Sequence, residues 1–321
     1  METFANLLGV DPFSIWFFFE VLIGGLMAGV MYSLVALGFV LIFKASSVFN
    51  FAQGVMVLFA ALNFVGFLEV FSDLPVVLQV ALAFIVTMGV MILLALVVER
   101  VVLRPLVNQA HISLFMATIG IAIFLEGFGE LIWGSNIKPL DIGIPDDVTF
   151  VGDAMIQDSD LFAAIVASIL VVTLALFFHY TRIGRALRAV ADDHQAALSI
   201  GIPLNHIWII VWSVAGFVAL VAGIMWGSKL GVQFSLSILA LKALPVLILG
   251  GFTSIPGAIV GGLIIGAGEK LAEIFLVDAI QTYIYSGFPA AIEEWFAYIL
   301  ALGFLVFRPQ GLFGEKIIER V

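Results

Sequence analysis

The chain contains no cysteine and carries little charge: only 11% of its 321 residues are Asp, Glu, Lys or Arg. The absence of cysteine excludes disulfide frameworks, thiolate metal sites, c-type haem attachment and thiol catalysis. The charge that is present is mostly acidic, and the net charge of -10 does not favour nucleic-acid binding. Hydrophobic residues make up 63% of the chain and the mean hydropathy is +1.22, far above the level of soluble domains. This composition and length are typical of a polytopic membrane protein.

Motifs of nucleotide-binding and hydrolytic enzymes are also missing. No Gly-Lys dipeptide occurs, so the chain lacks a Walker A lysine and cannot hydrolyse a nucleotide through a P-loop. The histidines show no HExxH spacing, and there is no Gly-x-Ser-x-Gly sequence. We therefore expect no enzymatic activity, and neither a metal nor a cofactor bound by this chain.

Apolar runs long enough to cross a membrane recur along the sequence. A helix needs about 20 mainly apolar residues to span about 30 Å of hydrocarbon. Nine segments are predicted to cross: 17–43, 55–71, 74–98, 112–133, 160–180, 207–227, 236–250, 257–276 and 290–307. The segments 55–71 and 236–250 are short, so either could be re-entrant or broken, and eight or ten crossings stay open. The predicted fold is an all-α transmembrane bundle that forms one membrane domain over residues 1–321.

The basic residues between the spans indicate the orientation, because cytoplasmic loops are enriched in Lys and Arg. With the N-terminus outside, the outer segments hold only Lys138 and Lys229. The inner segments hold Lys44, Arg100, Arg104, Arg182, Arg185, Arg188, Arg308, Lys316 and Arg320. This distribution favours an odd number of crossings and a cytoplasmic C-terminus. The stretch 134–159 is then the longest external loop, and its aspartates are most simply a solvated charge run: Asp141, Asp146, Asp147, Asp153 and Asp158.

The cytoplasmic segment 181–206 is predicted to form two short helices. Its first part is amphipathic, with apolar residues at helical spacing and arginines on another side: Ile183, Ala186, Leu187 and Val190, against Arg182, Arg185 and Arg188. Asp192, with Gln195 three residues later, has the pattern of a capping box for a second helix, which Gly201 and Pro203 would end. This helix pair could bind another protein, or it could lie on the anionic headgroups of the membrane lipids.

Glycines at small-xxx-small spacing predict close packing between helices. Gly25 and Gly29 show this spacing in the first span, and a Gly-rich stretch late in the chain repeats it: Gly250, Gly251, Gly257, Gly261, Gly262 and Gly266. Such spacing lets helix backbones approach closely in lipid. Packing is a much better interpretation of this stretch than a phosphate cradle, since the Walker A lysine is missing.

Asn50, Gln53 and Gly54 belong to a polar break between two apolar runs. Irregular backbone at membrane depth is tolerated where it is buried in protein or lines a water-filled cavity. This break is therefore either part of a solute path or an ordinary inner loop that caps the next helix.

Few charged residues lie inside the predicted spans. Glu126 and Lys242 lie deepest, and a charge at a helix centre costs about 2.5–3.5 kcal/mol on insertion scales unless it is paired or hydrated. Both are candidates for the solute path, although their spacing in sequence does not support a pair. Glu269, Lys270 and Glu273 fit a local group that stabilises a helix.

Four segments together resemble the membrane subunits of ABC importers for branched-chain amino acids and related polar solutes, closest to the LivH type. They are 32–38 (YSLVALG) leading to 50–54 (NFAQG); 185–193 (RALRAVADD) with Ala196, Ala197 and Gly201; 242–258, which contains LGG and SIPGA; and 308–314 (RPQGLFG). They occur in family order across nearly the whole chain. The family often has His at the position of Gln53 and an acidic residue at that of Val55, so these two departures bear on solute choice.

The resemblance implies a permease subunit of the bacterial inner membrane. Its implied partners are a second homologous permease, two cytoplasmic ATPases that bind ATP, and a periplasmic or extracellular solute-binding protein. It assigns the polar break at 50–54 to the translocation path, and it assigns the inner helix pair to an ATPase contact: Arg185, Arg188, Ala191, Asp192, Gln195, Ala196, Ala197 and Gly201. We expect a bulky charged residue in place of Ala197 to uncouple transport and to leave folding largely intact. Family members also import urea, amides and organic acids, so the resemblance does not fix the solute.

Two other functions fit parts of the same sequence. An ion-coupled secondary carrier or channel that acts alone would use Glu126, Lys242 and broken helices as ion and solute sites. A membrane scaffold without transport would leave the polar breaks unexplained. Solute movement by the purified chain in liposomes, without ATPase partners, separates the carrier from the importer subunit.

Overall fold

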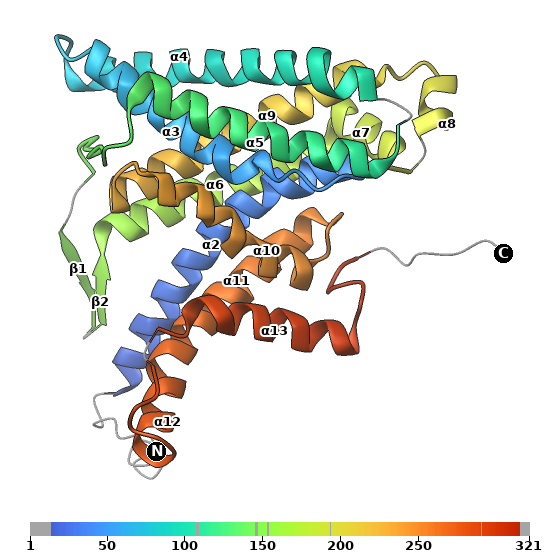
Figure 1. Ribbon diagram of the computed structural model, residues 1–321. Coiled ribbons are helices and arrows are strands. Elements are labelled where there is room, and N and C mark those ends of the chain that lie inside the picture. Colours follow the sequence, from blue (N-terminus) through green and yellow to red (C-terminus); the bar gives the residue numbers. More distant parts are fainter. Residues whose placement is uncertain are drawn as a thin grey trace. The chain divides into compact units, whose positions relative to one another are not determined.

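The computed structural model describes residues 14–106, 109–144, 147–152, 154–192, 194–289 and 291–314, and most of them are helical (Figure 1). The α-helices are α2 (Ser14–Ser46), α3 (Ala52–Val70), α4 (Val76–Val97), α5 (His111–Trp133), α6 (Asp158–Tyr180), α7 (Arg182–Asp192), α8 (His194–Ser199), α9 (Leu204–Leu230), α10 (Leu239–Gly250), α11 (Ile255–Leu271), α12 (Val277–Tyr283) and α13 (Glu293–Phe307). Shorter π- and 3-10 turns adjoin them: η1 (Val98–Leu103), η2 (Arg104–Leu106), η3 (Phe234–Ile238) and η4 (Ala272–Leu276). The strands are β1 (Val148–Val151) and β2 (Ala154–Gln157).

Six helices are long and apolar enough to cross a membrane: Ile15–Ser46, Ala52–Val70, Val76–Leu106, Ile112–Trp133, Asp158–Tyr180 and Leu204–Leu230. Each coincides with one of the predicted segments, because a run of about 20 apolar residues is the requirement in both cases. The segment near 55–71 is one continuous helix of 19 residues. The chain is thus a multi-pass helical membrane protein.

The other three predicted segments form shorter helices. The helices Phe234–Gly250 and Ile255–Tyr283 are bent by 114° at the break between them, so the segment 236–250 is part of a bent pair. Its α-helix, α10, has 12 residues and contains Pro245, which gives it a length of only about 18 Å. α13 has 15 residues. Length and composition therefore support six spans, or seven if the bent pair is one span, and nine crossings stay a prediction.

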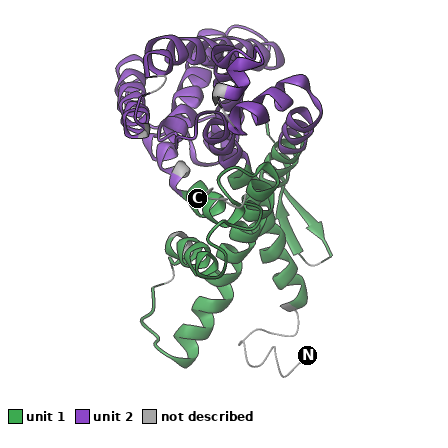
Figure 2. Cartoon of the chain, turned by 90° about the vertical axis from the view of Figure 1, so that its right-hand side faces the viewer, with its two compact units in different colours: residues 1–33, 144–169, 242–321 green, residues 34–143, 170–241 purple. Residues whose placement is uncertain are grey.

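The described chain divides into two compact units, and each unit draws on separate parts of the sequence (Figure 2). Unit 1 comprises residues 1–33, 144–169 and 242–321, and unit 2 comprises 34–143 and 170–241. Three of the four divisions fall inside helices, namely α2, α6 and α10, so the units are not domains that follow one another along the chain. The predicted single membrane domain stays a prediction.

In unit 2, α3 is the central helix. It packs against α4, α5 and α9, and 83% of its most apolar window is buried. A helix that is hydrophobic on every side is expected to be buried in this way. By contrast, only 22% and 28% of the corresponding windows are buried in the helices Val76–Leu106 and Ile112–Trp133. In a membrane protein, large exposed apolar surfaces of this kind face lipid or another subunit.

In unit 1, α11 packs against α13 and the η4 turn. Ala272, Val277 and Ile292 form a small buried core, against which Phe288 and Phe296 pack. This core holds the return of the chain from α12 to α13. This packing keeps the segment between α12 and α13 inside unit 1.

The stretch 134–159, which was predicted as an external loop, contains a short antiparallel β-hairpin made of β1 and β2. The carboxylate of Glu20 on α2 accepts a hydrogen bond of 2.9 Å from the backbone N–H of Met155 in β2. The hairpin was not predicted because strands of four residues leave almost no periodicity to detect. Asp146 and Asp153 lie outside the described residues.

Candidate functional site

The polar break predicted at 50–54 forms an ordered joint between α2 and α3. α2 ends at Ser46, Ser47 adopts a positive φ of 56°, and α3 begins at Ala52. The side-chain oxygen of Asn50 accepts a hydrogen bond of 3.1 Å from the backbone N–H of Ala52. This bond satisfies one of the free donors at the start of α3, which is the usual role of an asparagine at a helix N-terminus.

Two neighbouring helices hold this joint in place. The hydroxyl of Thr118 on α5 accepts a hydrogen bond of 3.2 Å from the backbone N–H of Phe51. From α9, the indole N–H of Trp208 donates to the carbonyl of Ala45 at 3.1 Å. The joint is therefore tied to the beginnings of both α5 and α9, and it is more constrained than an ordinary loop.

Gln53 lies wholly inside unit 2, with 0% of its surface exposed. Its Nε2 donates a hydrogen bond of 3.4 Å to the carbonyl of Ala215 on α9. Its Oε1 has no hydrogen-bond partner among the described residues, and an unpaired buried amide oxygen costs free energy. Gly38 on α2 leaves the space that this amide fills, because a Cβ at position 38 would overlap it.

The predicted path residues are thus buried in this conformation. Asn50 is 0% exposed like Gln53, and Gly54 is buried beside them. Their observed contacts hold α2, α3 and α9 together. Their place in a translocation path stays a prediction.

The charged residues of the spans are distributed over both units. Glu126 is half-buried on α5 in unit 2, and the described residues offer it no hydrogen bond or ion pair. Lys242 is half-buried on α10 in unit 1, and a pair between the two stays untested. Of the predicted local group, the pair of Lys270 at the end of α11 and Glu273 in η4 is confirmed, since the ammonium lies 2.8 Å from the carboxylate.

The predicted cytoplasmic segment forms α7 and α8, and the apolar face of α7 packs on protein. Leu187 and Val190 are 1% and 0% exposed, and α7 contacts α9. The amphipathic pattern is therefore confirmed. In unit 2, α7 is anchored to the ends of neighbouring spans and does not lie free.

Arg185 and Arg188 cap the C-terminal end of α6. Arg188 donates through Nη1 to the carbonyl of Phe178 at 2.8 Å, and through Nη2 to the carbonyl of His179 at 3.3 Å. Arg185 donates through Nη1 to the carbonyl of Tyr180 at 3.3 Å. The last four carbonyls of an α-helix have no partner within the helix, so these guanidinium groups supply hydrogen-bond donors to carbonyls that the helix leaves unpaired. Sequence reasoning assigned both arginines to an ATPase contact and missed this role, although a basic run directly after a helix end is a signal for it.

The boundary between α7 and α8 lies close to the predicted position but differs from it in the role of Asp192. Asp192, which was predicted to cap the second helix, is instead the last residue of α7. Residue 193 and the side chain of Gln195 lie outside the described part of the chain. The predicted end of the second helix is correct: Gly201 has a φ of 85° and follows the last turn of α8.

α8 exposes apolar side chains around one buried residue. Ala197 is 1% exposed, whereas Leu198 and Ile200 are 51% and 73% exposed. Because Ala197 is buried, we expect a bulky charged residue there to disturb the packing of α8, and the prediction that such a variant folds normally stays untested. The exposed pair is the better place to test a partner contact.

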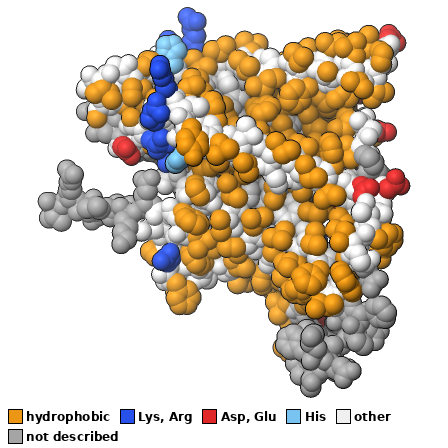
Figure 3. Space-filling model, turned by 180° about the vertical axis from the view of Figure 1, so that it is seen from behind, with side chains coloured by type: hydrophobic (Ala, Val, Ile, Leu, Met, Phe, Trp, Pro, Cys, Tyr) orange, Lys and Arg blue, Asp and Glu red, His pale blue; other side chains and the backbone are white. Residues whose placement is uncertain are grey.

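α6 separates the acidic stretch from the basic helix α7. α6 starts directly after β2, has 23 residues, and ends one residue before α7, which corresponds to about 35 Å. Asp158, the last aspartate of that stretch, and α7 therefore lie at opposite ends of this helix. Figure 3 shows the Lys and Arg side chains gathered in a band near one edge, beside a broad hydrophobic surface. The membrane side of each end stays a prediction, and Lys316 and Arg320 lie outside the described residues.

Glycines of α2 and α11 meet backbone to backbone in unit 1. Gly25 lies against Gly266, and Gly29 lies against Gly262, with no room for a Cβ at these contacts. The hydroxyl of Ser33 extends the contact by donating to a carbonyl of α11 at 3.2 Å. This is the close approach that small-xxx-small spacing permits.

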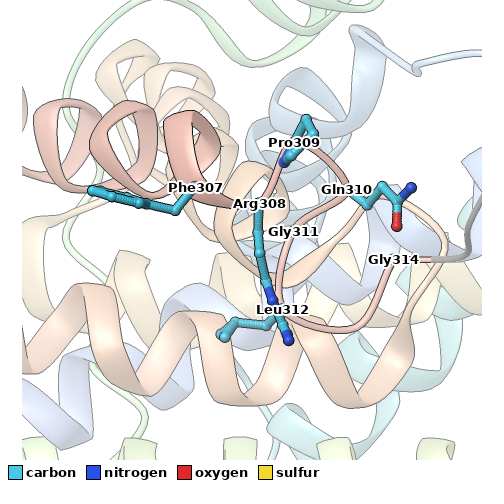
Figure 4. Close-up of a pocket in the computed structure, with 7 residues that line it drawn as sticks. All are labelled: Phe307, Arg308, Pro309, Gln310, Gly311, Leu312 and Gly314. Atoms are coloured by element: carbon cyan, nitrogen blue, oxygen red, sulfur yellow. The ribbon is translucent and has the colours of Figure 1, made fainter.

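The C-terminal segment 308–314 pairs with the turn between α10 and α11. The backbone N–H groups of Leu312 and Phe313 donate to the carbonyls of Leu249 and Gly250 at 2.7 and 3.2 Å. Two of the segments that carry the family resemblance thus form one structure. The same segment lines a pocket of about 350 Å³ (Figure 4), formed by Phe307, Arg308, Pro309, Gln310, Gly311, Leu312 and Gly314. Because its lining comes from one short segment, the pocket belongs to the packing of this turn.

The described residues contain no group of three or more His, Asp or Glu side chains placed to hold a metal ion. The polar features that stand out are therefore the α2–α3 joint and the helix pair α7–α8. The first lies inside a bundle, and the second lies at the end of α6 and exposes apolar side chains.

The chain is similar to transport proteins over nearly its whole length. A family model described as branched-chain amino acid transport system, permease component, matches residues 21–307. The chain is 27% identical to the permease protein LivH of a high-affinity branched-chain amino acid transport system from Salmonella typhimurium, over 95% of this chain and 98% of LivH. It is 29% identical to the corresponding protein BraD from Pseudomonas aeruginosa, over 96% of this chain and 99% of BraD. It is also 29% identical to LsrC, a permease protein of the autoinducer 2 import system from Yersinia enterocolitica, over 63% of this chain and 54% of LsrC.

Proposed function

The chain belongs to the family of permease components of branched-chain amino acid transport systems, and on this premise we propose that it is the membrane permease subunit of an ATP-driven importer. The subunit resides in the bacterial inner membrane. It binds no nucleotide itself, and ATP is bound and hydrolysed by partner subunits. The premise also accounts for the missing Walker A lysine.

One observation supports this proposal more than any other: the helix pair α7–α8 is anchored at the end of α6 and presents exposed apolar side chains. Leu187 and Val190 fix α7 to the protein, while Leu198 and Ile200 on and after α8 point outward. We propose that a cytoplasmic ATPase binds this helix pair. Nucleotide binding to the ATPase then shifts the equilibrium between two conformations of the helical bundle. The proposed contact also includes Arg185, Arg188, Ala191, Asp192, Gln195, Ala196, Ala197 and Gly201.

The proposed complex contains a second homologous permease, two ATPases and a solute-binding protein on the outer side. In the proposed orientation the N-terminus is outside and nine crossings bring the C-terminus to the cytoplasm. Solute passes between the two permeases. The weakly buried surfaces of Val76–Leu106 and Ile112–Trp133 provide apolar area for a partner or for lipid.

The proposed solute is a branched-chain amino acid or a related small polar molecule, such as another amino acid, urea, an amide or an organic acid. LivH and BraD are named for branched-chain amino acid transport, and LsrC is named for autoinducer 2 import. The family therefore restricts the solute without fixing it. We propose that the path passes the α2–α3 joint at Asn50, Gln53 and Gly54, and that Glu126 and Lys242 border it.

A second function, an ion-coupled carrier that acts alone, is favoured by one observation. Glu126 lies in an apolar span and the described residues give it no ion pair, as expected of an ion site in such a carrier.

The experiment that tests both functions is reconstitution in liposomes, of the chain alone and of the chain with the ATPases and the solute-binding protein of the proposed importer. The importer predicts uptake that requires all components and ATP hydrolysis. Solute uptake by the chain alone, driven by an ion gradient, would contradict the importer and support the carrier.

A further inference from the structure

The joint between α6 and α7 is very short and is held by several hydrogen bonds. Only Thr181 separates the two helices. Its hydroxyl accepts a hydrogen bond of 3.2 Å from the backbone N–H of Gly184, and its carbonyl accepts one of 3.2 Å from the N–H of Arg185. A Cβ at Gly184 would collide with the carbonyl of Phe178, so the first turn of α7 lies directly on the last turn of α6.

Two guanidinium groups bind the end of α6 at this joint: Arg185 donates to the carbonyl of Tyr180 at 3.3 Å, and Arg188 reaches further back along the same helix. Arg188 binds the carbonyls of Phe178 and His179 at 2.8 and 3.3 Å, across ten and nine residues of chain. Its planar fork suits a contact with two acceptors, which a lysine ammonium on a flexible stem cannot reproduce. Arg182, on the same helix, is exposed and has no hydrogen bond or ion pair among the described residues. The two arginines therefore differ in contacts while carrying the same charge.

We infer that Arg188 is a positioning residue of the importer, one that makes α6 and α7 move as one body. This inference rests on the proposed function, in which an ATPase displaces α7–α8. A joint of one residue without the Arg188 contact could absorb such a displacement as a change of φ and ψ, because hinges are usually a few residues at the ends of helices. With the contact in place, the displacement is transmitted to α6.

α6 extends the effect of this contact across the membrane span. Its first residue, Asp158, follows β2 without an intervening residue, and β2 is bonded through Met155 to Glu20 of α2. α6 is one continuous helix of 23 residues, so a displacement that enters at its C-terminal end acts on the helix itself.

The test uses the complete importer in liposomes, with Arg188→Ala, Arg188→Lys and the matched control Arg182→Ala. ATP hydrolysis and solute uptake are measured on the same preparation, and assembly is measured by co-purification of the ATPases. In the complexes that retain the ATPases, we expect Arg188→Ala to take up about a third or less of the solute per ATP hydrolysed that the unaltered importer takes up. Arg188→Lys should lie between, and Arg182→Ala should keep the unaltered ratio.

Three results would overturn the inference. The first is an unchanged ratio of uptake to hydrolysis in both Arg188 variants. The second is an equal loss in Arg182→Ala, which would indicate an effect of charge alone. The third is a loss of assembly in both Arg188 variants but not in the control, which would show that Arg188 serves the fold or the ATPase contact and not the transmission to α6. A failure of the unaltered importer to take up solute with ATP would instead overturn the proposed function.

Discussion

The side-chain amide of Gln53 occupies the place where a side chain at position 38 would begin. Gly38 is the residue of α2 that faces this amide, and a Cβ there would overlap both Nε2 and Cδ of Gln53. The amide then reaches across to the carbonyl of Ala215 on α9. Three helices of unit 2 thus meet at one polar side chain, and the absence of a side chain on one of them makes the contact possible.

The pair Gly38 and Gln53 should therefore be energetically coupled. Gly38→Ala displaces the Gln53 amide from its bond to Ala215, and should lower the stability of the chain in detergent by about 1–3 kcal/mol. In the double variant Gly38→Ala/Gln53→Ala the added methyl group fills space that the amide has left. Its loss of stability should be smaller than the sum of the two single losses by about 0.5 kcal/mol or more. Strictly additive losses in thermal or denaturant unfolding would contradict this packing.

The contact between α2 and α11 should tolerate no side chain at Gly29. A Cβ there would stand 3.0 Å from the Cα of Leu263, so the backbones would have to separate, at a cost of about 1–3 kcal/mol. Gly24 on the same helix has no atom of another described residue within 4 Å of such a Cβ. Thermal unfolding in detergent should show a clear loss for Gly29→Ala and none for the control Gly24→Ala. Equal behaviour of the two variants would argue against this close approach.

The C-terminal segment should depend on Gly311. Its φ of 79° is unfavourable for other residues, by about 1–2 kcal/mol, and a Cβ there would lie 2.8 Å from the backbone nitrogen of Gly251. Gly311→Ala should release the segment and speed hydrogen exchange at the N–H groups of Leu312 and Phe313. Gly303→Ala on α13 is the control, since a Cβ at Gly303 meets no atom of the described residues within 4 Å. Unchanged exchange in Gly311→Ala would refute the pairing.

Most of the helices could be predicted from the sequence because hydropathy over about 20 residues reports directly on the cost of placing a segment in lipid. The same reasoning was weakest where helices are short or bent. α10 contains Pro245 and ends at Gly250, and an apolar run of this length does not distinguish a crossing from a broken span. The β-hairpin was missed because its strands have four residues each.

The candidate site was predictable as a set of segments but not as a set of contacts. The polar break and the amphipathic helix are visible as patterns in the sequence. Tertiary packing decides the contacts within these segments. It buries Gln53, it buries Ala197 beside the exposed Leu198, and it brings Arg188 to the end of α6. One sequence without its fold does not specify which face of a short helix is covered, since α8 is too short to show a period.

The exposed apolar residues of α8 provide the most direct test of the ATPase contact. Leu198 and Ile200 are 51% and 73% exposed, so replacing either with Asp removes no internal packing and should leave the chain folded. If an ATPase covers them, each replacement buries a charge in an apolar contact. Leu198→Asp and Ile200→Asp should then weaken co-purification of the ATPase about tenfold or more, as expected of a residue near the centre of an interface.

The matched control for these variants is Phe150→Asp on β1. Phe150 is 65% exposed, and its strand lies at the β2 end of α6, away from α7. This variant should retain the ATPase, because it introduces the same charge at the end of the span where no ATPase is proposed to bind. Ala197→Asp should instead lower both co-purification and thermal stability, since the Ala197 side chain is buried. Retention of the ATPase by Leu198→Asp and Ile200→Asp would mean that α8 faces lipid headgroups, and it would remove the main support for an ATP-driven importer.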